Sequence, residues 1–322
     1  MARTTMMLTI AFVLAACGSG SSGGGNEGQA DSGGGGDESY VFLPKSLNNP
    51  YWADAREGMN AAAEDLGVQA EFIGPDTPDA AQQLQLFESA ISRNPNGIAV
   101  SPINAETIAS AISRATAQGI PVIAWDGPAP DSEAVAYVGT DNVAAGEKLA
   151  EAVASNLNEE GQVAVLAGNL TAINARERLE GFEQGLEQYP NIEIVTQETT
   201  GESVEGATST AENLLQAQPE LDALVGITGA DAPGAGLAVQ GANRCDEVQV
   251  AGFDVVEQGV ELMRNGCVQA LVSQKPYGMT VQALELLNKL DEGGEAEQEA
   301  YDTGTILVTP ESLEQFLEEA PH

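Results

Sequence analysis

The chain has 322 residues and a formal net charge of −37, which comes from 49 acidic and 12 basic residues. Binding to nucleic acid or to anionic lipid requires clusters of Lys and Arg, so this charge argues against both as partners. The charge predicts a strongly hydrated exterior and does not describe a ligand. The length exceeds what one compact core usually contains, so two lobes are expected.

The N-terminal stretch MARTTMMLTIAFVLAAC predicts a signal peptide over residues 1–17. It has a single basic residue, Arg3, and its apolar stretch is shorter than the about 20 residues that span a membrane. Its end, Leu14 to Cys17, resembles a bacterial lipobox, which makes Cys17 the expected lipidation site. The alternative is an ordinary cleavable signal with an incidental cysteine. Two acyl chains on Cys17 would suffice for stable anchoring.

Residues 18–39 are rich in Gly and Ser and contain no repeating apolar positions, so they predict a disordered linker. As a flexible coil, this linker would span about 25 Å on average. A lipid anchor followed by such a tether predicts an extracytoplasmic protein, held at the cell membrane only through its lipid. The tether therefore favours lipidation of Cys17 over the alternative.

From residue 40 the chain alternates short β-rich runs with helical stretches, which predicts an α/β fold with parallel sheets and right-handed crossovers. The first helix is expected over Pro50–Leu66, with Asn49 as its N-cap and Gly67 at its end. The pattern restarts after residue 141. Later helices are expected near 142–157, 174–188 and 204–217, between runs such as QVAVLAG, LDALVGIT and VQVAGFD.

Polar residues end nearly every predicted strand of both halves. In parallel sheets, ligands gather at the carboxyl ends of the strands. Two halves with polar strand ends facing one another predict a ligand cleft between two lobes. The residues at these ends are Lys45 with Asn49, Ser101, Asp126, Asn169, Thr228, Asp254 and Gln274.

Tyr51 and Trp52 follow Pro50 at the start of the first predicted helix. Aromatic rings that pack on apolar C–H faces, beside polar groups that take hydroxyls, are typical of a sugar site. We expect at least one of the two rings to contact ligand. The alternative is that Trp52 heads an apolar stripe in the core, which continues through Ala55, Met59, Ala62 and Leu66.

The helix NARERLEGFEQGLEQY separates two arginines by their phase. Arg178 lies at the edge of the apolar stripe, whereas Arg176 falls on the polar face. Because a buried unpaired charge is costly, Arg178 needs partners, and it is expected to clamp the ligand. Arg176 is expected at the surface.

Beyond Cys17, the cysteines Cys245 and Cys267 are too few and too far apart for a zinc site, and no metal site is predicted. Each precedes a β-like run, and neighbouring parallel strands begin at the same edge of a sheet. In an exported protein this favours a disulfide over two free thiols.

The chain resembles the ribose-binding-protein family, the sugar-binding components of ABC importers with the type I periplasmic-binding fold. The resemblance covers about residues 40–309 and rests on LNNPYW, IPVIAWD, TDNVAAGEKLA, ARERLEGF, VAGFD and LVSQ. It implies a monomer without a cofactor, which captures a monosaccharide or polyol and delivers it to a permease that is coupled to an ATPase. The ligand contacts it implies are Asn49, Tyr51, Trp52, Asp126, Arg178, Phe253, Asp254 and Gln274.

Some positions depart from the pattern of the pentose-binding members. Gly127 replaces an Arg, Thr228-Gly229 replaces an Asn-Asp pair, and the second-lobe aromatic position falls near Gly201. Lys45 is similar to the branch that binds autoinducer-2 and rhamnose, but the acidic pair of that branch does not match AINA. We therefore count Lys45 and Thr228 among the ligand-binding candidates and expect ribose not to be the best ligand.

The same resemblance implies three crossings between two Rossmann-like lobes, near Gly139–Asp141, Gln274–Pro276 and Thr303–Thr305. The N-terminal lobe is then 40–140 plus 275–304, and the C-terminal lobe is 141–274 plus 305–322. The three crossing strands would form a hinge, and the lobes would close on ligand.

Other functions fit the sequence less well. An enzyme is not expected, because the one histidine is His322 and no Ser or Cys lies in a nucleophile context. A sugar-responsive repressor would carry a DNA-binding domain where this chain has a signal and a linker. Delivery of the ligand to a sensory receptor rather than to a permease remains an open alternative.

Replacing Cys17 tests the lipid anchor. In a Cys17→Ala variant no thiol can receive the diacylglyceryl group, so the protein should appear in the medium or remain unprocessed. Membrane fractionation and the mass of the N-terminal peptide measure this outcome. Normal membrane retention of the variant would contradict the prediction.

Overall fold

The computed structural model describes residues 38–319. The sequence-based expectations for the signal peptide, Cys17 and nearly all of the linker lie outside this range. Within it, no helix combines the length and the apolar character that a membrane crossing requires.

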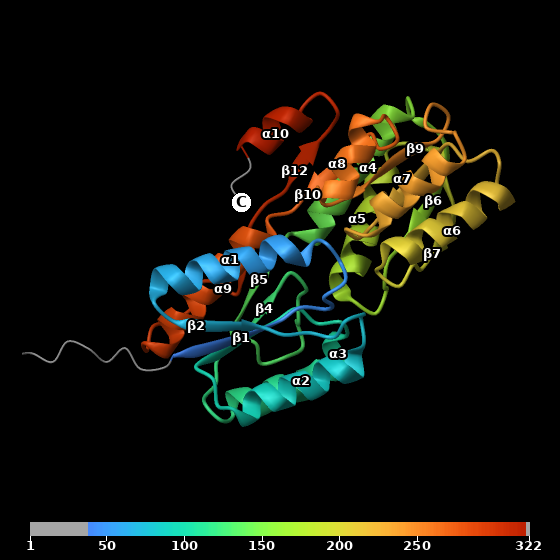
Figure 1. The fold of residues 1–322 in the computed structure, drawn as a ribbon. Helices are drawn as coiled ribbons and strands as arrows, with labels where there is room; N and C mark the ends of the chain where they lie inside the picture. Colours follow the sequence, from blue (N-terminus) through green and yellow to red (C-terminus); the bar gives the residue numbers. More distant parts are fainter. Residues whose placement is uncertain (1–37, 320–322) are drawn as a thin grey trace, which may run out of the picture. The chain divides into compact units, whose positions relative to one another are not determined.

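Two six-stranded sheets form the framework, and both have the same strand order. Figure 1 shows the sheets with the helices that pack on them. The first sheet contains β11 (Ala300–Asp302), β5 (Ala136–Gly139), β4 (Val122–Trp125), β3 (Gly97–Val100), β1 (Ser39–Leu43) and β2 (Gln69–Phe72). The second contains β12 (Ile306–Val308), β10 (Ala270–Ser273), β9 (Gln249–Phe253), β8 (Ala223–Gly226), β6 (Glu160–Leu166) and β7 (Asn191–Glu198). The predicted α/β class with two parallel sheets is confirmed, with one exception. Strand β12 pairs antiparallel with β10.

Helices cover both faces of each sheet and bury the central strands on both sides, whereas edge strands such as β2 and β7 remain partly exposed. In the first half, α1 (Trp52–Leu66) and α9 (Pro276–Asp291) pack on one face, and α2 (Ala80–Ser92) and α3 (Ala105–Thr116) pack on the other. In the second, α4 (Asn142–Asn156) and α5 (Ile173–Leu186) share one face. The opposite face holds α6 (Val204–Ala217), α7 (Asp231–Gly241), α8 (Glu257–Arg264) and α10 (Leu313–Glu319).

The chain passes between the two sheets at three places. It leaves the first sheet after β5, returns through α9 after β10, and leaves again between β11 and β12. The first and second passages carry Thr140 and Gln274, whose side chains are joined by a hydrogen bond of 2.9 Å.

Helix α1 begins two residues later than predicted. The Asn49 side chain does not cap the helix itself; its Oδ1 accepts a hydrogen bond from the Tyr51 N–H at 3.1 Å. A side-chain bond two residues ahead forms a turn that competes with the helix, so Pro50 and Tyr51 lie in a turn and α1 starts at Trp52. The helix ends at Gly67 as predicted, with a φ of 71°. Leu66 is 37% exposed and does not belong to the buried stripe.

Cys245 and Cys267 form a disulfide across 22 residues of sequence. The bond connects the segment after α7 with the segment before β10. By the chain-entropy model, closing a loop of this length stabilises the fold by about 3 kcal/mol.

Helices α4 and α5 touch backbone to backbone through glycines. A Cβ on Gly146 would collide with the carbonyl oxygen of Arg178, and one on Gly181 would collide with the carbonyl oxygen of Val143. This close packing fixes the position of Arg178 on α5, because the Arg178 carbonyl is itself one of the contacts with α4.

A methyl group at Gly181 should therefore be costly. We expect Gly181→Ala to lower the free energy of unfolding by about 1–3 kcal/mol, because the two helices must separate. Gly241→Ala is the matched control: Gly241 is also helical, and among residues 38–319 nothing lies within 4 Å of the position that a methyl group there would take. That change should be neutral or stabilise the protein by about 0.4–1 kcal/mol. Urea unfolding of both variants measures the difference, and equal stabilities would contradict the helix packing.

Candidate functional site

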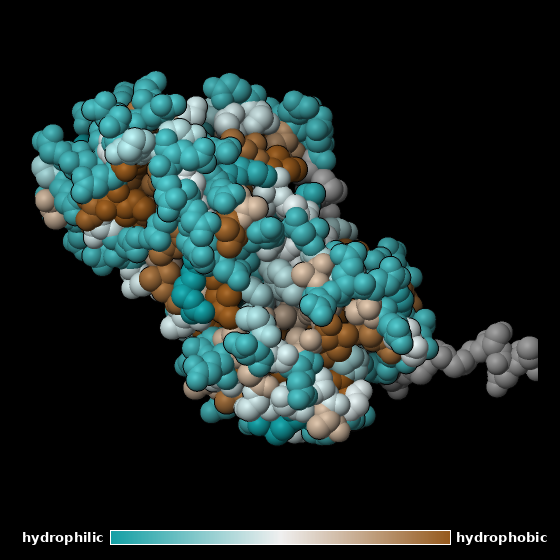
Figure 2. Space-filling view, turned by 180° about the vertical axis from the view of Figure 1, so that it is seen from behind, coloured by the Kyte–Doolittle hydropathy of each residue, from teal (hydrophilic) through white to brown (hydrophobic). Residues whose placement is uncertain are grey.

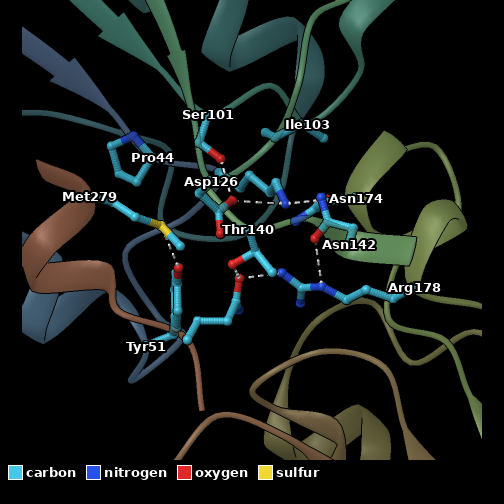
Figure 3. Close-up of polar contacts among 12 residues, drawn as sticks. Pro44, Tyr51, Ser101, Ile103, Asp126, Thr140, Asn142, Asn174, Arg178 and Met279 are labelled. Carbon is cyan, nitrogen blue, oxygen red and sulfur yellow. Dashed lines mark hydrogen bonds and ion pairs between the residues drawn. The ribbon is translucent and has the colours of Figure 1, made fainter. Parts of the chain in front are cut away.

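Polar side chains from the carboxyl ends of both sheets meet in one buried network. Figure 3 shows part of it, around Asp126 and Arg178. Lys45 follows β1, Ser101 follows β3 and Asp126 follows β4 in the first sheet. Thr228, Asp254 and Gln274 follow β8, β9 and β10 in the second. All six are buried, as Lys45 at 3% exposure and Gln274 at 5% illustrate. The structure thus brings together five of the polar strand ends that the sequence singled out: Lys45, Ser101, Asp126, Asp254 and Gln274.

Lys45 joins the two halves. Its Nζ donates to Oδ1 of Asn174 on α5 at 2.8 Å and lies 3.2 Å from Oδ2 of Asp126. The Ser101 hydroxyl donates to the same carboxylate oxygen at 2.6 Å. A second bond between the halves runs from the Thr171 hydroxyl to the carbonyl oxygen of Ile103 at 3.2 Å. The described conformation is therefore one in which the two strand-end surfaces are in contact.

Asp126 and Asp254 occupy equivalent positions in the two sheets. Asp126 follows β4 and Asp254 follows β9, which hold the same place in the two strand orders. Each has a left-handed backbone, with φ values of 57° and 67°. The Asp126 N–H donates to the Val138 carbonyl and the Asp254 N–H to the Val272 carbonyl, in the adjacent strand in both cases. This backbone turn ends the strand and directs both carboxylates into the network.

Arg178 is buried at 2% exposure and is held by groups from several elements. Its Nε donates to Asn142 Oδ1 at 2.9 Å, its Nη2 to Gln274 Oε1 at 2.6 Å, and its Nη1 to the Ile227 carbonyl at 3.3 Å. The guanidinium lies over the Phe253 ring, 4.5 Å from the ring centre. Arg178 thus reaches the network as predicted, whereas Arg176 is exposed and donates to the Leu170 and Thr171 carbonyls.

Gln274 connects the arginine to the second aspartate. Its Oε1 accepts hydrogen bonds from Arg178 and from the Thr140 hydroxyl, and its Nε2 donates to Asp254 Oδ1 at 2.9 Å. Because Gln274 and Thr140 lie on segments that pass between the sheets, the network and the passages share side chains.

The two aromatic residues after Pro50 have different surroundings. The Tyr51 hydroxyl points into the network, where it donates to the Met279 sulfur at 3.6 Å (Figure 3). Trp52 packs edge-on against Trp125, with ring centres 5.4 Å apart, inside the core beneath α1. Within the described part of the chain, its Nε1 has no hydrogen-bond partner. Trp52 therefore takes the core position that the sequence left open as an alternative.

The two strand-end aspartates have different electrostatic surroundings. Burial raises the pKa of Asp254 to about 6, although the Arg178 charge and the Gln274 amide oppose this. For Asp126 burial acts in the same direction, but Lys45, Arg178 and the Ser101 hydroxyl together hold its pKa below the usual value. Asp126 is thus the fixed anion of the network, and Asp254 is the carboxylate that can titrate near neutral pH.

Both hydrogen-bond donors of Thr228 are used by a nearby carboxylate, that of Asp231. The Thr228 N–H and hydroxyl both donate to Asp231 Oδ2, at 2.9 and 2.8 Å, and the Thr200 hydroxyl donates to Asp231 Oδ1. Burial nevertheless raises the pKa of Asp231 to about 7. Asn169 also turns away from the network, since its Oδ1 accepts from the N–H and hydroxyl of Thr171.

Several buried residues of the site are not among those that the sequence predicts. Thr140 and Asn142 lie in TDN at the restart of the pattern, and Asn174 lies in AINA, where the resemblance points to an acidic pair. Beside the site, and not hydrogen-bonded to it, Glu202 is a further buried carboxylate in the segment TTGES, after β7. Their positions, directly after a strand or close to the start of a helix, could have identified them in the sequence. Side chains at these positions lie at the carboxyl edge of a parallel sheet, where ligands bind.

The network alternates donors and acceptors, with two cations, neutral amides and hydroxyls, and carboxylates. Within residues 38–319 no group of three or more His, Cys, Asp or Glu side chains is placed to hold a metal ion. Such a set of groups can satisfy a small, neutral ligand that carries many hydroxyls.

Comparison with known proteins places the chain in a family. A model of the periplasmic binding protein domain matches residues 40–295. The D-allose-binding periplasmic protein of Escherichia coli is 28% identical over 264 residues, which cover 79% of this chain and 85% of that protein. The ribose import binding protein RbsB of the same organism is 27% identical, over 84% of this chain and 90% of its own.

Solved structures agree with these relatives. GanP, a glucose-galactose binding protein from Geobacillus stearothermophilus, is 30% identical with a TM-score of 0.82, over 86% of this chain and 99% of its own. An ABC transporter solute binding protein from Burkholderia graminis, solved in complex with D-arabinose, has a TM-score of 0.83 and 30% identity, over 86% and 96% of the two chains. With a family model matched over most of the described range, this chain belongs to the periplasmic binding protein domain family.

Proposed function

We propose that the protein is an extracytoplasmic solute-binding protein of an ABC importer, which captures a monosaccharide or related polyol between its two halves. The observation that carries the proposal is the buried polar network to which both sheets contribute at their strand ends. The relatives support the substrate class, since their names specify allose, ribose, glucose or galactose, and arabinose. The family has a binding role, and no reaction is proposed.

The charged and neutral groups of the network would make different contacts with a sugar. Lys45 and Arg178 would donate to hydroxyl or ring oxygens, and Asp126 and Asp254 would accept from hydroxyls, because charged groups form the stronger hydrogen bonds. Gln274 would keep the side chains of Arg178 and Asp254 in place through its hydrogen bonds to both. Tyr51 and Phe253 would provide aromatic surface. Thr228, whose N–H and hydroxyl already donate to Asp231, would offer a ligand at most its hydroxyl oxygen as an acceptor. Asn49 and Trp52 would support the Tyr51 turn and the core behind it.

We further propose that the halves move as two lobes, 40–140 plus 275–304 and 141–274 plus 305–322, about the three passages between the sheets. A ligand that contacts both lobes only in the closed form shifts the population toward that form. The closed protein would then present its ligand to a permease. Attachment through Cys17 and the 18–39 linker would keep it at the membrane. We propose that it acts there as a monomer.

A thermal-shift screen tests the proposed function. Over pentoses, hexoses, deoxysugars, polyols and autoinducer-2, at least one monosaccharide or polyol should raise the melting temperature, because a ligand that binds only the folded state stabilises it. Ribose should not give the largest shift, since Lys45 and Thr228 replace the groups of the pentose-binding members. No shift with any compound would overturn the function, and a largest shift with ribose would overturn only the interpretation of those departures.

The two arginines of α5 give the sharpest test of the site. Arg178→Ala should weaken the affinity for the best sugar by about 10- to 150-fold, because each hydrogen bond to a charged group contributes about 1.5–3 kcal/mol. Arg176→Ala removes only an exposed charge on the same helix, which contributes a few tenths of a kcal/mol at most.

Titration calorimetry of both variants measures the difference, and circular dichroism checks that each remains folded. Arg178→Lys, which keeps the charge but not the three-way donation, should fall between the wild type and Arg178→Ala. Equal affinities for Arg178→Ala and Arg176→Ala would remove Arg178 from the site.

A further inference from the structure

Glu202 is a buried carboxylate next to the network that no part of the proposed site uses. It lies between β7 and α6, directly before Ser203, the residue that caps α6. Only 4% of its surface is exposed. A Cβ built on Gly168, in the segment after β6, would lie 3.2 Å from the Glu202 Cγ and even closer to Thr228. Glu202 therefore lies beside the strand ends of the second sheet.

The charges that act on Glu202 are those of the network. Burial raises the pKa of its carboxyl; Lys45 and Arg178 oppose this, and Asp126 adds to it. Lys45 and Asp126 belong to the first sheet, so the carboxylate is within electrostatic reach of the opposite half. Its burial and its short distance to the Gly168 position beside Thr228 agree with this and place Glu202 at the strand ends of the second sheet, away from the exposed face of α6.

Within residues 38–319, the Glu202 side chain forms no hydrogen bond or ion pair, although only 4% of the residue is exposed. Its oxygens are not among the fully enclosed side-chain atoms that lack a partner, so a small solute can reach them. Its neighbour Asp231 provides the comparison, because that carboxylate is also buried but accepts from Thr200 and twice from Thr228. Leaving a buried carboxylate without donors is costly, and such groups in native proteins call for an explanation. The missing partners are hydrogen-bond donors, and a bound ligand in the network would lie where it could supply them.

We propose that Glu202 is a specificity-determining residue that accepts a hydrogen bond from a donor group of the ligand. The inference rests on the proposed function and deepens it. Two kinds of ligand carry such a donor: a neutral sugar has a hydroxyl group, and an amino sugar has an ammonium group. A ligand with hydrogen or a methyl ether at that position leaves the carboxylate without a donor and binds more weakly.

The test combines changes in the protein with changes in the ligand. The best sugar of the thermal-shift screen is compared with its single-position deoxy and amino analogues, by titration calorimetry. The proteins are the wild type, Glu202→Gln, which keeps the shape, and Glu202→Leu, which removes the acceptor. Glu205→Gln is the matched control, because Glu205 is an exposed carboxylate in the first turn of α6.

For the wild type, one deoxy position should weaken binding by about 10-fold or more, the effect of one hydrogen bond to a charged group. In Glu202→Leu this ratio between parent and deoxy analogue should fall to about one, and Glu202→Gln should be intermediate. Glu205→Gln should keep the wild-type ratio. If an amino analogue binds the wild type more tightly than the parent sugar does, and this gain is lost in Glu202→Leu, the donor is an ammonium group. If the amino analogue binds the wild type more weakly than the parent, the donor is a hydroxyl.

Two results separate the inference from the function beneath it. If the wild type binds sugar and every ratio is unchanged in Glu202→Leu, the role of Glu202 is overturned and the function stands. If the wild type binds no compound of the panel, the function itself is overturned, and the inference falls with it. A ligand-free melting temperature that drops by several degrees in Glu202→Gln would show a structural partner for the carboxylate and would also overturn the inference.

Discussion

The burial of charged side chains between the two sheets is the constraint on which the rest of the structure depends. Removing one partner of a buried ion pair typically costs about 3–5 kcal/mol, so each buried charge requires partners at hydrogen-bond distance. For Lys45 these partners are Asp126 in its own half and Asn174 in the other. For Arg178 they are Asn142 and Gln274, which lie where the chain enters and leaves the second sheet. The charges therefore link the strand ends to the passages between the sheets.

This arrangement follows from the repetition of one topology. Both sheets have the same strand order, and the aspartates after their third strands have the same left-handed backbone and the same N–H bond to the adjacent strand. The surroundings make the two carboxylates different. Against the effect of burial, Lys45 and the Ser101 hydroxyl keep Asp126 ionised, whereas at Asp254 burial outweighs its partners and the pKa rises to about 6. One backbone motif thus provides two acceptors of different strength.

Much of this can be predicted from the sequence, because a polar residue after a buried apolar run is a local pattern. Asp126, Asp254 and Gln274 stand out in this way, and the phase of one helix separates Arg178 from Arg176. Partners that depend on the meeting of distant segments carry no local pattern. Asn174 gains its role only because Lys45 arrives from the first sheet, 129 residues away in sequence.

A local ambiguity, and not a distant partner, explains why α1 starts later than predicted. The Asn49 side chain can bond either to the helix end or to the N–H two residues ahead, and both outcomes fit the sequence. The structure uses the second, and the helix starts at Trp52. The Trp52 ring lies in the core against Trp125 because it is in phase with the buried residues Ala55 and Met59 of the same helix. Tyr51, left in the turn, is the ring whose polar end reaches the network.

The exterior and the network follow different electrostatic rules. Hydrophilic residues dominate the face shown in Figure 2, and the chain carries a net charge of −37. Exposed charges are screened over about 8 Å at physiological ionic strength, so they act on an approaching ligand but hardly on one already enclosed. An anionic solute would be repelled on approach, whereas a neutral one would not. Inside, two buried cations stand against several carboxylates, which also disfavours an anion. Both effects select against negatively charged solutes, so discrimination among neutral ones is left to the positions of individual donors and acceptors.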